Sequence, residues 1–118
     1  MSENFDRYDS DRLPKVVVTY LDAHDDHRTA DAAALFTPGA TVLDDGKTYE
    51  GSAEITEWLR NSATEYSYTS TRIGQHSADD RYPVVLIRLD GNFPGGTATV
   101  HYRFELDGDR IRRLAIEA

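Results

Sequence analysis

Cysteine is absent from this chain of 118 residues, and tryptophan and methionine occur once each. The absence of cysteine excludes disulfide bonds, thiolate nucleophiles, zinc knuckles and iron–sulfur clusters. Long apolar runs are also missing, since no stretch approaches the roughly 18 apolar residues of a membrane-spanning helix. Residues 1–12 lack the basic and apolar regions of a signal peptide, so we expect a cytoplasmic protein that does not associate with membranes.

Positive charge is scarce. The 21 acidic residues outnumber the 13 basic ones, which gives a formal net charge of −8. This is the wrong sign for a protein that binds a phosphate backbone, so we expect no nucleic-acid partner. The chain also lacks a P-loop, a G-x-G-x-x-G motif and a G-x-S-x-G motif. We therefore expect no cofactor.

The composition fits one compact domain. Hydrophobic residues make up 39% of the chain, which is enough for a core that needs no metal or disulfide at this length. We predict a single domain over residues 1–118, with residues 1–10 as a flexible N-terminal segment.

The clearest helical pattern lies near the N-terminus. We predict a helix over residues 11–27, with Pro14 in its first turn. Its apolar face carries residues that recur at intervals of three and four: Leu13, Val16, Val17, Tyr20, Leu21 and His24.

Two shorter helices follow. The first is predicted over residues 30–36, capped by Thr29 and ended by the Pro-Gly pair at 38–39. The second is predicted over residues 53–61 and is opened by Gly51-Ser52. Its inward face carries Ile55, Trp58 and Leu59.

The remaining segments have the pattern of strands. A short hairpin is predicted over 40–44 and 47–50, with Asp45-Gly46 as its turn. Longer strands are predicted over 65–74, 82–89, 97–106 and 110–117. Helices first and strands afterwards predict an α+β fold, in which helices pack on one face of a curved antiparallel sheet.

The strand over 97–106 alternates most clearly. Its inward set is Ala98, Val100, Tyr102, Phe104 and Leu106. Its outward set is Thr97, Thr99, His101, Arg103 and Glu105. Because helices can cover only one face of such a sheet, the outward set is either exposed to solvent or forms one side of a dimer interface.

Two polar clusters are candidates for chemistry. His24, Asp25, Asp26 and His27 form either a metal site or a solvated helix end, and we prefer the helix end and expect no metal. Asp44 closes an apolar strand just before the turn. If Asp44 leans inward, desolvation makes it a candidate general base or acid; otherwise Asp44 and Asp45 simply cap the hairpin.

The order of elements and local motifs resembles the nuclear transport factor 2-like superfamily, and most closely its SnoaL-like branch. The resemblance runs from about residue 13 to 117. It is carried by Tyr20-Leu-Asp-Ala-His24, by Ala33-Ala-Leu-Phe36-Thr-Pro-Gly-Ala-Thr-Val-Leu-Asp44, by Tyr49-Glu-Gly51 with Ile55 and Trp58, and by the closing Tyr102-Arg-Phe104 to Ile111 strand pair. It implies a cone made of one strongly bent sheet around a long N-terminal helix, with a pocket at the wide end.

Within that superfamily, the resemblance to ketosteroid isomerase implies roles for two residues. In that enzyme a carboxylate base faces an oxyanion hole. Asp44 falls on the position of the carboxylate base, and Tyr20 falls on that of the tyrosine in the oxyanion hole. Val100 occupies the position of the second donor and cannot donate a hydrogen bond. Phe36 and Leu59 replace the tyrosines that would support Tyr20.

The expected pocket is apolar and aromatic, and it suits a small, flat, largely apolar molecule. Its predicted lining is Tyr20, Phe36, Trp58, Tyr66 or Tyr68, Leu89, Phe93, Val100 and Tyr102, although each aromatic is also explained as core.

Two functions remain open from the sequence. The chain is either a cofactor-independent isomerase, cyclase or dehydratase that uses Asp44 and Tyr20, or a module that binds a small hydrophobic ligand or another copy without catalysis. We also expect a homodimer through the outer sheet face around Thr97, Thr99, His101 and Arg103.

Overall fold

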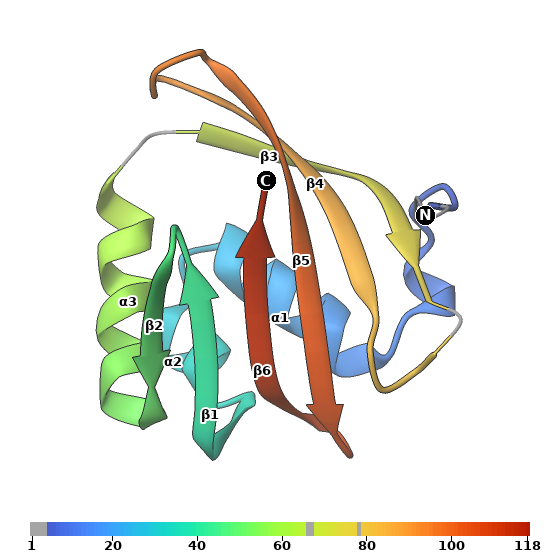
Figure 1. Cartoon of the computed structure of the whole chain (residues 1–118), viewed down its shortest axis with the longest axis vertical. Coiled ribbons are helices and arrows are strands. Elements are labelled where there is room, and N and C mark those ends of the chain that lie inside the picture. The colour runs from blue at the N-terminus through green and yellow to red at the C-terminus, as the bar shows by residue number, and fades with distance from the viewer. Residues whose placement is uncertain (1–4, 66–67, 78) are drawn as a thin grey trace.

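The computed structural model describes residues 5–65, 68–77 and 79–118. Its sheet has six strands in the order β2-β1-β6-β5-β4-β3 (Figure 1). The strands are β1 (Phe36–Asp44), β2 (Lys47–Glu50), β3 (Tyr68–His76), β4 (Val84–Gly91), β5 (Thr97–Asp107) and β6 (Arg110–Glu117). The helices are α1 (Lys15–Asp25), α2 (Thr29–Ala33) and α3 (Gly51–Glu65). The curved sheet with few helices confirms the predicted α+β class.

One strand pair differs from the predicted antiparallel sheet. β1 and β6 run parallel, whereas the other four pairs of neighbours are antiparallel. Between β1 and β6 the chain passes through α3 and the long strands on the far side of the sheet, and β6 returns to the centre beside β1 (Figure 1).

The first helix is shorter than predicted. α1 begins at Lys15 because Pro14 adopts an extended conformation, and residues Ser10–Arg12 form a separate 3-10 turn. The helix ends at Asp25 because His27 has a positive φ of 56°, which a helix does not accommodate.

The predicted end of the second helix is wrong. α2 stops at Ala33, and the Pro-Gly pair at 38–39 belongs to β1. This pair lies where the register between β1 and β6 shifts, between Phe36 and Thr41. Proline has no N–H for a regular ladder, so a register shift is where a strand tolerates it.

The third helix is longer than predicted, since it begins at Gly51 and continues to Glu65. The carboxylate of Glu54 accepts the backbone N–H of Glu50 at 3.2 Å and so closes the start of the helix. Gly51 has a φ of 82°, which lets the chain turn directly from β2 into the helix.

The predicted hairpin and the alternation of β5 are confirmed. Asp45 and Gly46 both have a positive φ, as a tight two-residue hairpin turn requires. On β5, the inward residues Tyr102, Phe104 and Leu106 are buried, whereas the outward Thr97 and Thr99 are exposed. The core lies between this inner face and the buried face of α1, which carries Val17, Tyr20 and Leu21.

The N-terminal segment from Phe5 onward is attached to β3. Asp6 and Gln75 exchange two backbone hydrogen bonds of 2.8 and 2.9 Å, and the side chain of Gln75 accepts the N–H of Asp9 at 2.8 Å. The ring of Phe5 lies 5.4 Å from that of His101, so the chain itself covers part of the outer sheet face. Within the described ranges, no helix has the length and apolar character needed to cross a bilayer.

Candidate functional site

A cavity of about 460 Å³ lies against the inner face of the curved sheet. Its wall combines the inner face of the sheet with α3, the β1–β2 turn and the β4–β5 turn. Polar lining comes from His24, Asp44, Asp45, Tyr68, Tyr102 and Glu117, and apolar lining from Trp58, Leu89, Phe93, Pro94, Ala98, Val100 and Ile116. A cavity of this size and character suits a small, mainly apolar molecule with a few polar groups.

Asp44 lies on this wall at the last position of β1. Its Oδ2 accepts a hydrogen bond from Trp58 Nε1 at 3.0 Å, which leaves Oδ1 without a partner among the described residues. The carboxylate is thus held by a side chain from α3 and does not cap the turn. A half-buried carboxylate that is oriented by one hydrogen bond on a cavity wall has the position of a candidate general base toward a bound molecule.

Tyr20 lies deeper than the wall. It is fully buried, and its ring packs edge-on against Phe36 and Phe104 at centroid distances of 5.6 and 5.9 Å. Burial raises the pKa of its phenol well above the ordinary value, and the nearby Tyr102, Tyr68, Asp44 and Asp25 raise it further. Its hydroxyl has no hydrogen-bond partner in the described part of the chain.

Two residues of the predicted site are therefore not among those that line the cavity. Tyr20 and Phe36 belong to the packed core beneath it. Six other residues of the predicted lining lie on the wall: Trp58, Tyr68, Leu89, Phe93, Val100 and Tyr102. Tyr66, the alternative to Tyr68, lies outside the described residues.

Trp58, Tyr68, Phe93 and Tyr102 bring aromatic rings to the cavity, two of them with a phenolic hydroxyl. The ring of Trp58 lies 6.0 Å from that of Tyr49, which fixes the indole next to β2. Burial raises the pKa of Tyr102 and of Tyr68, and the carboxylates of Asp44 and Asp25 add to both shifts. Both phenols therefore stay protonated at neutral pH and can donate hydrogen bonds.

His24 is a wall residue that the sequence interpretation missed, since it was placed at a solvated helix end. Its side chain is only 13% exposed, and its Nδ1 lies 3.8 Å from Asp25 Oδ1. The signal was present, because His24 continues the apolar face of α1 four residues after Tyr20. Among the residues that the structure describes, no three histidine or acidic side chains are grouped so as to hold a metal ion.

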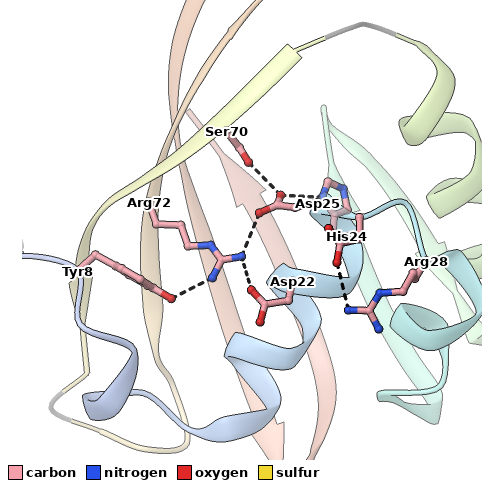
Figure 2. A network of polar contacts seen from close by, with 8 residues as sticks. Tyr8, Asp22, His24, Asp25, Arg28, Ser70 and Arg72 are labelled. Atoms are coloured by element: carbon pink, nitrogen blue, oxygen red, sulfur yellow. Dashed lines mark hydrogen bonds and ion pairs between the residues drawn. The ribbon is translucent and has the colours of Figure 1, made fainter.

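A polar network holds the end of α1 against β3 (Figure 2). The Arg72 guanidinium donates to Asp22 at 2.8 Å, to Asp25 at 3.0 Å and to the Tyr8 hydroxyl at 3.0 Å. Asp25 also accepts the Ser70 hydroxyl at 2.9 Å. Burial alone would raise the pKa of Asp25, but the interactions with His24, Ser70 and Arg72 outweigh it and lower the pKa. The network fixes the helix end that carries His24.

Solved structures share this architecture. A protein of Sinorhizobium meliloti provisionally named a polyketide cyclase has 30% sequence identity and a TM-score of 0.87, with 93% of this chain and 100% of that chain covered. A Catenulispora acidiphila protein with a ketosteroid isomerase-like fold, solved in complex with trimethylamine, has 16% identity and a TM-score of 0.75 over 90% of this chain and 86% of its own. A Methylobium petroleophilum protein with a cystatin-like fold has 18% identity and a TM-score of 0.73 over 94% and 78%.

No curated protein matches the chain. The sequence model of the SnoaL-like domain, however, matches residues 17–114, which include every helix and strand except part of α1 and the end of β6. Together with the identity to the Sinorhizobium meliloti structure over nearly the full length, this match shows that the chain belongs to the SnoaL-like domain family.

Proposed function

We propose that the cavity binds a small, largely apolar carbonyl compound and that Asp44 moves a proton on the carbon next to its carbonyl group. Isomerisation, cyclisation and dehydration of ketones can each proceed through such a step. The observation that carries the proposal is the carboxylate of Asp44, held by Trp58 on the wall of an aromatic cavity with one oxygen unpartnered among the described residues. The name of the Sinorhizobium meliloti relative, polyketide cyclase, points to the same carbonyl chemistry.

The proposed step needs a base and a hydrogen-bond donor. Asp44 takes the proton from the carbon, and the negative charge that develops moves to the carbonyl oxygen. The resemblance assigns the donor to Tyr20. In that arrangement, the ligand would have to reach a hydroxyl that lies below the cavity wall.

Binding without catalysis is the second candidate. It is supported by Val100, which lies on the wall at the position of the second donor and has no polar group. In that case the chain would hold a ligand without accelerating any proton transfer.

Exchange of carbon-bound hydrogen with solvent tests the proposal without knowledge of the natural substrate. The probe is 2-tetralone, a flat bicyclic ketone, followed by NMR in D₂O. We expect the protein to accelerate exchange next to the carbonyl, and Asp44→Asn to lower the accelerated rate by about 100-fold or more. Asn at this position keeps an acceptor for Trp58 Nε1, so the variant removes the base and retains the hydrogen bond.

The matched control is Asp109→Asn, which removes the same charge from an exposed turn between β5 and β6. This variant should exchange the probe at the unmodified rate. Binding of 2-tetralone with no acceleration would favour the non-catalytic candidate, and equal rates for Asp44→Asn and the unmodified chain would exclude Asp44 as the base.

A further inference from the structure

We propose that Tyr102, on β5, donates the hydrogen bond that holds the ligand's carbonyl oxygen during proton transfer. This inference rests on the proposed function, and it moves the donor from the helix to the sheet. Tyr102 is only 5% exposed and lies on the cavity wall. Unlike the Tyr20 hydroxyl, the Tyr102 hydroxyl is not one of the enclosed side-chain atoms that lack a partner in the described part of the chain. Because Tyr102 lines the cavity, its hydroxyl can donate to an acceptor that a ligand supplies.

The register of the sheet places Tyr102 in the same row of residues as Asp44, the proposed base. Asp44 on β1 is paired with Ile116 on β6, which is paired with Tyr102 on β5. Two interstrand spacings separate the Asp44 and Tyr102 backbones, or about 10 Å. Because both side chains line the cavity, a flat ligand between them can present a carbon to Asp44 and an oxygen to Tyr102.

The deeper tyrosine is less well placed for this role. The hydroxyl of Tyr20 is wholly enclosed, and Tyr20 is not among the residues that line the cavity. Burial raises the pKa of both phenols, so both are protonated and available as donors. Position therefore separates them, since only Tyr102 reaches the wall.

Tyr102 also accounts for the missing second donor. Val100 occupies that position, and Tyr102 lies two residues further along the same inward face of β5. The side chain of Tyr102 is longer than that of Val100, and it brings an O–H to the cavity from two residues further along the strand. The sheet then still supplies a donor, although from another residue.

The proposed proton transfer needs no reactant other than the ligand and these two side chains. The Asp44 carboxylate takes a proton from the carbon next to the carbonyl, and the electron pair of the broken C–H bond forms a C=C bond. The carbonyl π electrons move to the oxygen, which becomes an enolate that accepts the hydrogen bond from Tyr102. Tyr102 keeps its proton, and Asp44 returns its own proton to the same carbon or to a conjugated one.

The test compares Tyr102→Phe with Tyr20→Phe in the 2-tetralone exchange assay. Loss of one oxyanion donor lowers such rates by about 100- to 1000-fold, and we expect this loss for Tyr102→Phe. For Tyr20→Phe we expect less than a tenfold loss. Tyr82→Phe, at an exposed tyrosine, is the matched control for removing a phenolic hydroxyl. Binding of tetralin, the hydrocarbon that lacks the ketone oxygen, should be unchanged in Tyr102→Phe, because its binding needs no hydrogen bond.

The outcomes separate the two proposals. If Asp44→Asn stops exchange and Tyr102→Phe does not, the base is correct and the inference about Tyr102 is overturned. If the unmodified chain gives no exchange, the proposed function fails and the inference fails with it. A second measurement uses the unmodified protein with tyrosine labelled at the ring carbon Cζ. Added 2-tetralone should shift the NMR signal of Tyr102 more than that of Tyr20, and the reverse order would also overturn the inference.

Discussion

The hydrogen bond between Asp44 and Trp58 joins two residues that are 14 positions apart in the chain. It connects the end of β1 to the middle of α3 and fixes the direction of the carboxylate (distance 3.0 Å). Trp58 is itself 4% exposed, so the indole is both a core residue and a wall residue. The position of the Asp44 carboxylate therefore depends on the packing of α3, which carries Trp58.

The contribution of this hydrogen bond to stability should be measurable as a coupling energy between Asp44 and Trp58. We expect Trp58→Phe to lower the free energy of unfolding by about 2–4 kcal/mol, through lost ring contacts and the lost N–H donor. The free energies of Trp58→Phe, Asp44→Ala and the double variant, from urea unfolding, form a cycle. A coupling of about 1 kcal/mol or more is expected, whereas strictly additive effects would show that the hydrogen bond contributes nothing.

Which site residues could be predicted depended on whether their position follows from a local pattern. Tyr102 and Val100 could be placed by strand alternation, and Trp58 by helical spacing. The depth of Tyr20 could not, because the apolar face of a helix is the same whether a residue touches core or cavity. His24 was missed because its polar neighbours suggested a solvated end, whereas its side chain is nearly buried and lines the cavity.

At the scale of elements, the ends of helices were the least predictable feature. Pro14 and the Pro-Gly pair at 38–39 are each compatible with several positions in a fold. Pro14 precedes α1 with an extended backbone, and pairing with β6 places the Pro-Gly pair in a strand. The hairpin turn at Asp45-Gly46 and the strand β5 were predictable because their patterns are short and local. The parallel pairing of β1 with β6 joins segments that are far apart in the sequence, so no local pattern indicates it.

The contact between α1 and β3 should make stability depend on pH. The pKa of Asp25 is lowered in the folded chain, so its interactions stabilise the fold above the ordinary aspartate pKa of about 4 and are lost as the pH falls through the folded value. We expect Asp25→Asn to reduce stability at pH 7 by up to about 1 kcal/mol, because the pair is partly exposed.

That difference should vanish in strong acid, where Asp25 is protonated in both states. Urea unfolding at pH 7, 4 and 2.5 measures it, with Asp109→Asn as the control for loss of one surface charge. The groups that face Asp25 are His24, Ser70 and Arg72. A difference that stays constant over this pH range would show that the effect of Asp25 is not electrostatic.

The attachment of the N-terminal segment to β3 depends on a glycine. A Cβ at Gly74 would lie 3.2 Å from the Asp6 carbonyl oxygen and 3.4 Å from Phe5 Cβ. We expect Gly74→Ala to loosen this contact and to speed amide hydrogen exchange at Asp6 and Gln75, which share two backbone hydrogen bonds. Gly39→Ala, where a Cβ meets nothing within 4 Å, should leave both amides unchanged. Equal exchange in both variants would contradict the close approach.

At the scale of the whole molecule, the outer face of the sheet remains the predicted dimer surface. The exposed Thr97 and Thr99 lie on it, but Phe5 covers part of it at His101. We expect a dimer in sedimentation velocity at micromolar concentration, and Thr99→Arg should shift it to monomer by placing like charges across the interface. Because the net charge is −8, added salt should favour association. A monomer under all these conditions would contradict the prediction.

The proposed function requires that a carbonyl compound occupy the cavity beside Asp44. Trp58 is the only tryptophan, so its indole N–H gives a single NMR signal that reports directly on the hydrogen bond to Asp44. On titration with 2-tetralone, we predict that this signal moves along a saturable curve, and that the movement changes in Asp44→Asn. An indole signal that stays fixed while 2-tetralone binds the protein elsewhere would contradict the account.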